Sequence, residues 1–326
     1  MTDKKRKFLY GSVPSRRLGL SYGVDIVPFK VCSLDCVYCQ LGRTITKTTE
    51  RKDYAPIDMV LAELKVALSE NIQADFITIA GSGEPTLHTH LGMLIEGIKK
   101  ITNTTVAILT NGSLLYRPDV RADCVKADVV IPSLDAGDEQ TFQKINRPYG
   151  DISIENVISG LCQLRDEFSG QIWLEVFLIE DINTGDDQLT RMKEAIELIR
   201  PDKIHLNTAV RPTAEPNIKR LDAEQLQDIA IRLGPNCEVI ADFSKTQNGI
   251  SSLPGSQETI LPVPIKGSKE AALLSMLKRR PCSLNDICAG LDIKHNEALK
   301  HISALQQRGL IHTETKDGNV FFKSSV

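Results

Sequence analysis

Six short runs of apolar and β-branched residues recur between residues 21 and 241, and amphipathic stretches separate them. We predict strands from these runs at Tyr22–Phe29, Asp75–Ala80, Thr105–Thr110, Asp128–Ser133, Ile172–Ile179 and Lys203–Asn207. Between them, one-sided apolar patterns predict helices, for example at Ile57–Leu68 and Leu189–Ile199. Right-handed crossovers turn such βα units into a curved parallel sheet with helices outside. Because closure needs eight units, the pattern predicts an α/β fold with a partial (βα)6 TIM-like barrel, whose ligand site lies at the carboxyl ends of the strands.

A change of composition after Ala241 divides the chain. Residues 242–268 are rich in Ser, Gly and Pro and lack helical periodicity, which predicts a linker or an irregular strap. We therefore expect a barrel domain at residues 1–241 and a separate small domain at residues 269–326.

The small domain shows three short helical patterns followed by a hairpin pattern. Ser283 is expected to cap the second helix, and the runs Leu310–Thr313 and Val320–Lys323 flank an Asp-Gly turn signal. Three helices and a two-stranded wing predict a winged helix-turn-helix domain. Its nine Lys and Arg against six Asp and Glu leave a surplus of three positive charges. That surplus does not decide between a nucleic acid and a protein or peptide as its partner.

Three of the eight cysteines lie in one loop, directly after the first predicted strand. Cys32, Cys36 and Cys39 have Cys-x3-Cys-x2-Cys spacing. Three thiolates in so short a loop can bind three irons of a [4Fe–4S] cubane and leave the fourth iron without a protein ligand. S-adenosylmethionine can chelate that iron through its amino and carboxylate groups. Zinc or plain redox thiols are the alternatives, although no neighbouring Cys or His completes a tetrahedral zinc site.

This cysteine spacing, with the aromatic Tyr38 just before the third cysteine, resembles the signature of the radical S-adenosylmethionine (radical SAM) superfamily. The segment from Gly81 to Thr86 resembles the family's Gly-Gly-Glu-Pro element, which holds the methionine amino group; Ser82 stands where a second glycine is usual. Thr110-Asn111-Gly112 is similar to an element near the cofactor carboxylate. Ser133-Leu134-Asp135 is similar to a segment that binds the ribose. Each motif ends a successive predicted strand, where a shared ligand would lie.

The resemblance implies three ligands for the cluster, Cys32, Cys36 and Cys39. It also implies that S-adenosylmethionine is bound by Tyr38, Gly81, Gly83, Glu84, Pro85, Thr110, Asn111, Ser133, Asp135 and Asn183. Three further stretches are similar to a little-characterised branch of Fe–S oxidoreductases related to wyosine synthases: Val13–Gly19, Asn146–Pro148 and Asn207–Pro212. The cluster loop lacks the longer flanks of the wyosine synthases, so their chemistry is not carried over.

Several polar residues near the predicted strand ends are candidates for contact with substrate. The cations are Arg16, Arg17, Lys30, Arg147 and Arg211. Gathered at one cavity, they would favour an anionic substrate, but surface arginines also pair locally without any ligand. Asn207, at the end of the sixth strand, is the stronger individual candidate. The sequence names no catalytic residue.

Two functions remain open from the sequence. The first is an enzyme that cleaves S-adenosylmethionine reductively to a 5′-deoxyadenosyl radical and acts on an unknown, macromolecular substrate such as tRNA or a peptide. The resemblance implies an electron donor such as flavodoxin or ferredoxin. The second is a DNA-binding regulator that senses iron–sulfur or S-adenosylmethionine status. Whether S-adenosylmethionine is consumed or recycled stays open.

The location is expected to be cytoplasmic. The basic run Lys4–Lys7 is not followed by an apolar stretch, and no apolar run approaches the roughly 20 residues that cross a bilayer. Clustered cysteines in such a chain indicate metal or redox chemistry in a reducing compartment.

Overall fold

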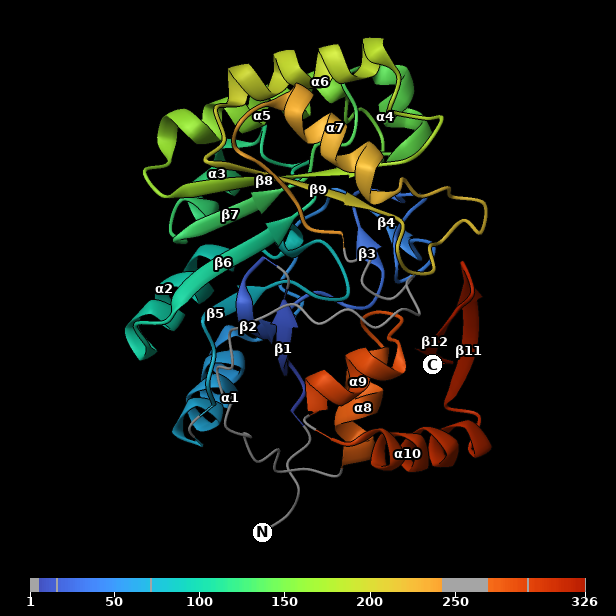
Figure 1. The fold of residues 1–326 in the computed structure, drawn as a ribbon. Helices are drawn as coiled ribbons and strands as arrows, with labels where there is room; N and C mark the ends of the chain where they lie inside the picture. Colours follow the sequence, from blue (N-terminus) through green and yellow to red (C-terminus); the bar gives the residue numbers. More distant parts are fainter. Residues whose placement is uncertain (1–5, 16, 71, 242–268, 292, 326) are drawn as a thin grey trace. The chain divides into compact units, whose positions relative to one another are not determined.

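The computed structural model describes residues 6–15, 17–70, 72–241, 269–291 and 293–325 (Figure 1). The chain forms two units. The larger one contains Arg6–Ala209 and Thr213–Ala241, and the smaller one contains Val210–Pro212 and the described residues from 269 onward. The strap predicted at residues 242–268 lies outside the described residues.

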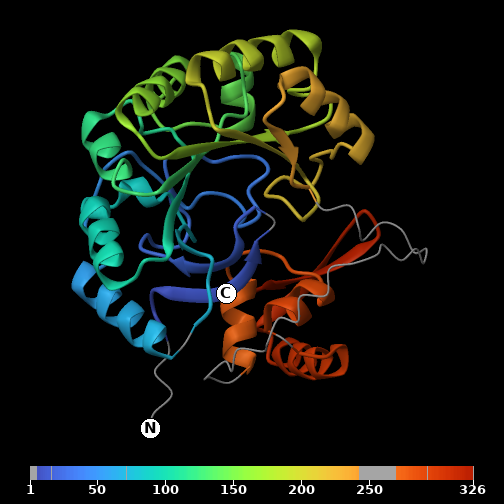
Figure 2. The same cartoon turned by 60° about the vertical axis from the view of Figure 1, so that its left-hand side comes forward.

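An eight-stranded sheet with the order β1-β2-β5-β6-β7-β8-β9-β10 forms the centre of the larger unit. Its strands are β1 Leu9–Ser15, β2 Gly19–Val24, β5 Phe76–Ile79, β6 Thr105–Thr110, β7 Val129–Pro132, β8 Gln171–Leu178, β9 Lys203–Thr208 and β10 Cys237–Val239. β1 and β2 are antiparallel, and all the other neighbouring strands are parallel. The sheet is curved, with helices along its outer side, and β1 and β10 are its two edges (Figure 2).

Five of the six predicted strands coincide with β5 to β9 to within two residues at each end. The first prediction, Tyr22–Phe29, was wrong in its bounds, because β2 ends at Val24. There the Asp25 carboxylate accepts hydrogen bonds from the Ser82 N–H at 3.1 Å and the Ser82 hydroxyl at 2.6 Å, and the chain turns away from the sheet. The edge strands β1 and β10 escaped prediction, since neither is a continuous apolar run.

Among the described residues, seven α-helices cover the outer side of this sheet: α1 Ile57–Ser69, α2 Leu91–Ile101, α3 Pro118–Cys124, α4 Glu139–Ile145, α5 Ile154–Glu167, α6 Asp186–Ile199 and α7 Ala223–Leu233. Side chains of Asp138, Ser153 and Asp222 cap α4, α5 and α7 by accepting from backbone N–H groups in the first turn. The apolar faces are fully buried; Val60 and Leu64 of α1 are examples. The two predicted helices are confirmed, α6 beginning three residues earlier than expected.

Two shorter features follow β2 and β5 along the chain. The pair β3 Val31–Cys32 and β4 Thr46–Lys47 is parallel and brackets the cysteine loop. A single 3-10 turn, η1 Pro85–Leu87, follows β5. These two features frame the candidate site.

The smaller unit contains α8 Lys269–Leu277, α9 Leu284–Leu291, α10 His295–Gln307 and the antiparallel hairpin β11 Ile311–Lys316 and β12 Asn319–Ser324. A buried cluster joins the three helices to the hairpin; it includes Leu273, Ile287, Ile302 and Phe322. As expected, the Ser283 hydroxyl accepts from the Asp286 N–H at 3.2 Å at the start of α9. None of the helices in the described ranges combines the length and the apolar composition that a membrane span requires.

Candidate active site

The cysteine loop is tied by its backbone to the end of α4. The Asp35 N–H donates to the Asn146 carbonyl at 2.9 Å, and the Val37 N–H donates to the Ile145 carbonyl at 2.9 Å. The Tyr149 N–H closes the connection by donating to the Ser33 carbonyl at 2.9 Å. The loop is therefore held in place by a segment more than a hundred residues further along the chain.

Each of the three cysteine sulfurs faces a side-chain N–H donor. The Lys30 ammonium lies 3.1 Å from the Cys39 Sγ. The Asn111 amide donates to the Cys32 Sγ at 3.4 Å, and the Asn146 amide donates to the Cys36 Sγ at 3.4 Å. These are donors suited to thiolates that carry negative charge.

Burial raises the pKa of at least two of these thiols. Desolvation, with Glu84 as the next contribution, raises the pKa of Cys32 to about 12, and desolvation also raises the pKa of Cys36 far above its usual value. A coordinated metal removes the thiol proton outright, so ion binding would be coupled to proton release.

The distances between the three cysteine sulfurs indicate whether they suit a cluster or a single zinc ion. In the described part of the chain, the one trio of ligand atoms that all lie within 4.8 Å of one another belongs to Asp53, His88 and His90, and not to the cysteines. Thiolates around one zinc ion stand about 3.8 Å apart, because each Zn–S bond is about 2.3 Å. The three cysteines therefore fit a polynuclear cluster better than zinc.

In the group of Asp53, His88 and His90, His88 is held by local hydrogen bonds. His88 is fully buried, its Nδ1 accepts from the His90 N–H at 3.0 Å, and its Nε2 lies 3.0 Å from the Ala55 carbonyl. The same Nε2 lies 3.2 Å from the Ala55 N–H. Both ring nitrogens of His88 are thus in hydrogen-bond contact with the protein.

Glu84 is buried in the turn after β5 and accepts four hydrogen bonds. Its Oε1 accepts from the Thr86 N–H at 3.1 Å and from the hydroxyls of Thr86 and Thr110, each at 2.6 Å. Its Oε2 accepts from the Asn111 N–H at 2.8 Å. Burial raises the pKa of Glu84 although all four donors oppose the rise. The carboxylate joins the end of β5 to the end of β6.

The glycines beside Glu84 are required by close contacts. A Cβ on Gly81 would lie 2.3 Å from the Asp25 carboxyl carbon, and a Cβ on Gly83 would lie 2.3 Å from the Val31 carbonyl oxygen. Ser82 fits between them because its hydroxyl binds Asp25. The serine that replaces the usual second glycine thus has its own partner.

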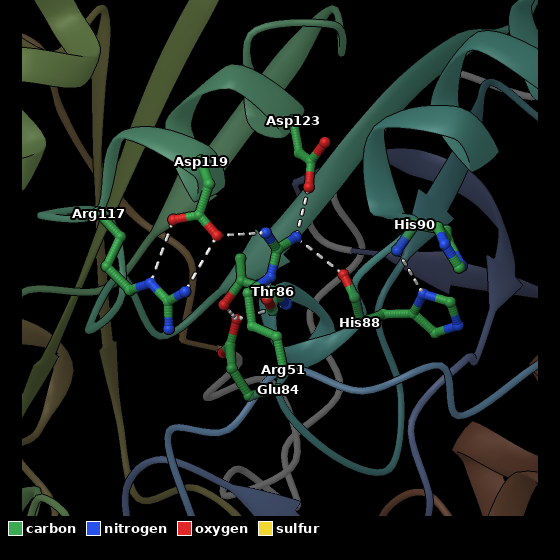
Figure 3. A network of polar contacts seen from close by, with 8 residues as sticks. All are labelled: Arg51, Glu84, Thr86, His88, His90, Arg117, Asp119 and Asp123. Atoms are coloured by element: carbon green, nitrogen blue, oxygen red, sulfur yellow. Dashed lines mark hydrogen bonds and ion pairs between the residues drawn. The ribbon is translucent and has the colours of Figure 1, made fainter.

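Arg51 binds the backbone of the turn that follows Glu84 (Figure 3). Its guanidinium donates to the carbonyls of Thr86 at 3.0 Å and His88 at 2.9 Å. It also pairs with Asp119 at 2.7 Å and with Asp123, both on α3. Its side chain is only 9% exposed. No motif in the sequence pointed to this residue.

Asp135 lies at the centre of a second buried network. Its carboxylate accepts from the Tyr38 hydroxyl, the Asn146 amide at 2.7 Å and the Phe177 N–H at 3.0 Å. Burial raises the pKa of Asp135 to about 6 against these donors. The Tyr38 ring stacks on Phe177 with 3.9 Å between ring centroids. Tyr38 and Asp135 are therefore brought together beside the cysteine loop.

The Asn183 side chain binds the backbone around it. It is fully buried, its Oδ1 accepts from the Ile179 N–H at 2.7 Å, and its amide donates to the carbonyls of Asp135 and Phe177, both at 2.8 Å. All its donors are used by the backbone, so it orders the turn after β8. Ser133, just after β7, forms an isolated parallel bridge with Glu175.

Each of the candidate substrate cations in the described residues has a local partner. Arg17 pairs with Glu175, Arg147 pairs with Glu215 at 2.7 Å, and Lys30 faces a cysteine sulfur. Arg211 belongs to the smaller unit, where its guanidinium lies 3.4 Å from the Asp286 carboxylate. Arg16 lies outside the described residues. Local carboxylates pair with three of these cations, so they give no support to an anionic substrate.

Asn207 binds Glu175, a buried acidic residue that the sequence did not indicate as part of the site. Its amide donates to the Glu175 Oε1 at 3.0 Å, and Arg17 binds the other oxygen. Burial alone would raise the pKa of Glu175, but Arg17 and Asn207 outweigh burial and hold it below its usual value. A single acidic residue within an apolar strand was the available signal.

Replacing Glu84 by glutamine is expected to destabilise the larger unit by about 1–3 kcal/mol, because the new amide N–H must face a buried donor. Urea unfolding followed by the fluorescence of Trp173 measures this, since Trp173 is the one tryptophan of the sequence and lies on β8. Glutamine at the exposed Glu194 of α6 is the control and should stay within about 0.5 kcal/mol of the parent. Equal unfolding midpoints for the two variants would show that the Glu84 bonds do not support the turn.

The chain is similar to several known proteins. Residues 26–198 match the sequence profile of the Radical SAM superfamily. A protein of Brachyspira hyodysenteriae named GTPase Obg is 36% identical over 322 residues, which is 99% of this chain and 46% of that protein. A UPF0026 protein of Methanocaldococcus jannaschii is 38% identical over 212 residues, 64% of this chain and 66% of that protein. This chain thus spans less than two thirds of either relative.

Among solved structures, SuiB of Streptococcus suis bound to S-adenosylmethionine superimposes with a TM-score of 0.50 and 15% sequence identity. The superposition covers 68% of this chain and 50% of that chain. At this level of identity the likeness shows a common α/β fold with a parallel sheet.

Proposed function

Because this chain belongs to the radical SAM superfamily, whose members use a [4Fe–4S] cluster and S-adenosylmethionine, we propose that it cleaves S-adenosylmethionine reductively and yields a 5′-deoxyadenosyl radical. Cys32, Cys36 and Cys39 would bind the cluster. Such a cluster supplies the electron for cleavage, and the protein supplies position and the exclusion of water.

One observation supports the proposal most directly. Asn111 donates through its backbone to Glu84 and through its side chain to the Cys32 sulfur, at 2.8 and 3.4 Å. The cysteine loop and the Glu84 turn are therefore adjacent. Adjacency is what a cofactor needs if its methionyl end is to reach both an iron and the Glu84 turn.

The cofactor contacts proposed around it follow this arrangement. The turn from Gly81 to Pro85 would bind the methionine amino group through its backbone, since the Glu84 carboxylate already accepts four protein donors. Asn111, with Thr110, would lie near the methionine carboxylate. Tyr38, Asp135 and Ser133 would lie near the nucleoside.

Beyond the cofactors, we propose a partial (βα)6 barrel with its substrate site at the strand ends, and a winged-helix domain in the smaller unit that recruits a tRNA or a peptide. Flavodoxin or ferredoxin would donate the electron, and the cytoplasm is the proposed location. We also propose that the chain belongs to the branch of Fe–S oxidoreductases related to wyosine synthases. The DNA-binding regulator has no observation in its favour among the described contacts.

The GTPase name of the Brachyspira relative is not carried to this chain. A P-loop needs a Gly-Lys pair followed by Ser or Thr, and the sequence contains no Gly-Lys pair.

The test is the formation of 5′-deoxyadenosine by anaerobically reconstituted protein with dithionite and S-adenosylmethionine, measured by mass spectrometry. The parent protein should release 5′-deoxyadenosine and methionine, and Cys36→Ser should release none above the background without a cluster. Cys162→Ser is the matched control, because Cys162 lies on α5 away from the loop, and it should keep full activity. A parent protein with an intact [4Fe–4S] cluster that yields no 5′-deoxyadenosine would refute the proposal.

A further inference from the structure

Three side chains from three separate parts of the chain each place an N–H donor on a different cysteine sulfur. Lys30 lies in the loop before β3, Asn111 follows β6, and Asn146 caps the C-terminus of α4. We call these three residues the sulfur donors. Hydrogen bonds to ligand sulfurs and nearby charge are among the factors that set the reduction potential of an iron–sulfur cluster.

The orientation of the Asn146 amide is fixed by its neighbours. Its Nδ2 faces two acceptors, the Cys36 Sγ at 3.4 Å and the Asp135 Oδ2 at 2.7 Å. The side chain is buried, with the residue 3% exposed. A flipped amide would turn its oxygen toward a carboxylate and a sulfur, so Nδ2 is the group that meets Cys36.

Lys30 is held by its backbone on both sides. Its N–H donates to the Ser82 carbonyl at 2.7 Å, and its own carbonyl accepts from the N–H groups of Ile45 and Thr46, both at 3.1 Å. The residue is 3% exposed and has φ 59°, an unusual value for a lysine. These backbone bonds fix the position from which the Lys30 side chain reaches the Cys39 sulfur.

The positive charge of Lys30 faces a cysteine sulfur rather than a carboxylate. Among the ion pairs of the described residues, none joins Lys30 to a carboxylate within 4.0 Å. A buried ammonium is costly unless an anion compensates it. Thiolates that bind a cluster are such anions, and one-electron reduction adds further negative charge beside the ammonium.

We propose that the sulfur donors set the reduction potential of the cluster, and that Lys30 has the largest effect because it alone carries a charge. This inference rests on the proposed function, since it takes the three cysteines as cluster ligands. Each donor stabilises the reduced cluster more than the oxidised one, because the reduced cluster is the more negative. Removing a donor makes the cluster harder to reduce.

The test is an anaerobic redox titration of the reconstituted protein with dithionite and mediators, followed by electron paramagnetic resonance. Lys30→Met keeps the length of the side chain and removes the charge. We expect its equilibrium constant for one-electron reduction to fall about tenfold, which is a shift of about 59 mV to lower potential. Lys30→Gln should give a smaller shift in the same direction. Lys47→Met, which removes an exposed ammonium from β4 next to the same loop, should leave the potential unchanged.

Iron and sulfide content of every variant is measured first, so that loss of the cluster is not mistaken for a change of potential. If Lys30→Met does not retain iron, Asn146→Asp provides the second variant, because it replaces a donor by an acceptor of nearly the same shape. A loaded Lys30→Met or Asn146→Asp protein with the parent potential would overturn the inference. If the parent protein itself assembles no [4Fe–4S] cluster, the proposed function fails instead, and the two failures are distinguishable.

Discussion

Replacing Arg51 by methionine is expected to lower the free energy of unfolding of the larger unit by about 3–5 kcal/mol, the usual cost of removing one partner from a buried ion pair. Asp123, whose side chain is 18% exposed, would lose its buried partner. The carbonyls of Thr86 and His88 would lose their donors as well. Urea unfolding followed by Trp173 fluorescence measures the change.

Two further variants make the Arg51 result specific. Arg51→Lys should recover only part of the loss, because one ammonium cannot reproduce a planar fork that meets two carboxylates and two carbonyls. Arg200→Met removes an exposed pair with Asp166, in which the two side chains are 61% and 67% exposed, and should cost less than about 1 kcal/mol. If Arg51→Met cost no more than Arg200→Met, the network in Figure 3 would not stabilise the Glu84 turn.

Replacing Gly83 by alanine is expected to disrupt the site as well as the fold. The new Cβ would lie 2.3 Å from the Val31 carbonyl oxygen and 2.8 Å from a Val27 methyl group. The Glu84 N–H donates to that same carbonyl at 3.0 Å, and Val31 is bonded to Cys32. Overpacking of this kind costs about 1–3 kcal/mol or more, and the backbone must shift to relieve it.

The measurement for Gly83→Ala pairs Trp173 fluorescence during urea unfolding with the iron content after anaerobic reconstitution. We expect a lower unfolding midpoint and less than the full amount of iron, because the Cys32 sulfur moves with Val31. Gly185→Ala is the matched control, since nothing lies within 4 Å of its added Cβ. Full iron content in Gly83→Ala would show that the loop tolerates the shift and that the contact does not position Cys32.

The sequence predicted most of the larger unit because its strands are short apolar runs with clear boundaries. β6 and the helix α1 agree with expectation to within one residue. The start of the sheet was less predictable. β2 has its amino-terminal half only partly buried, and the apolar residues after it, Ile26 and Val27, pack in a loop. An apolar run alone does not distinguish a strand from a buried loop.

The candidate site divides in the same way. The cysteines and the motifs after successive strands were predictable, since their spacing and order are local properties of the sequence. The roles of Arg51, Lys30 and Asn146 were not, because each depends on a contact with a partner chosen by the folded sheet. The contacts of Asn183 were not predictable either: its side chain binds the backbone of Asp135, Phe177 and Ile179.

The hydrogen bonds to the sulfurs have a consequence for maturation of the protein. The donors to Cys32 and Cys36 lie 79 and 110 residues further along the chain than the sulfurs they face. A nascent chain that has released only its first hundred residues therefore holds the cysteines without two of these donors. All three side-chain donors to the cysteine sulfurs are present in the chain only once α4 has been synthesised.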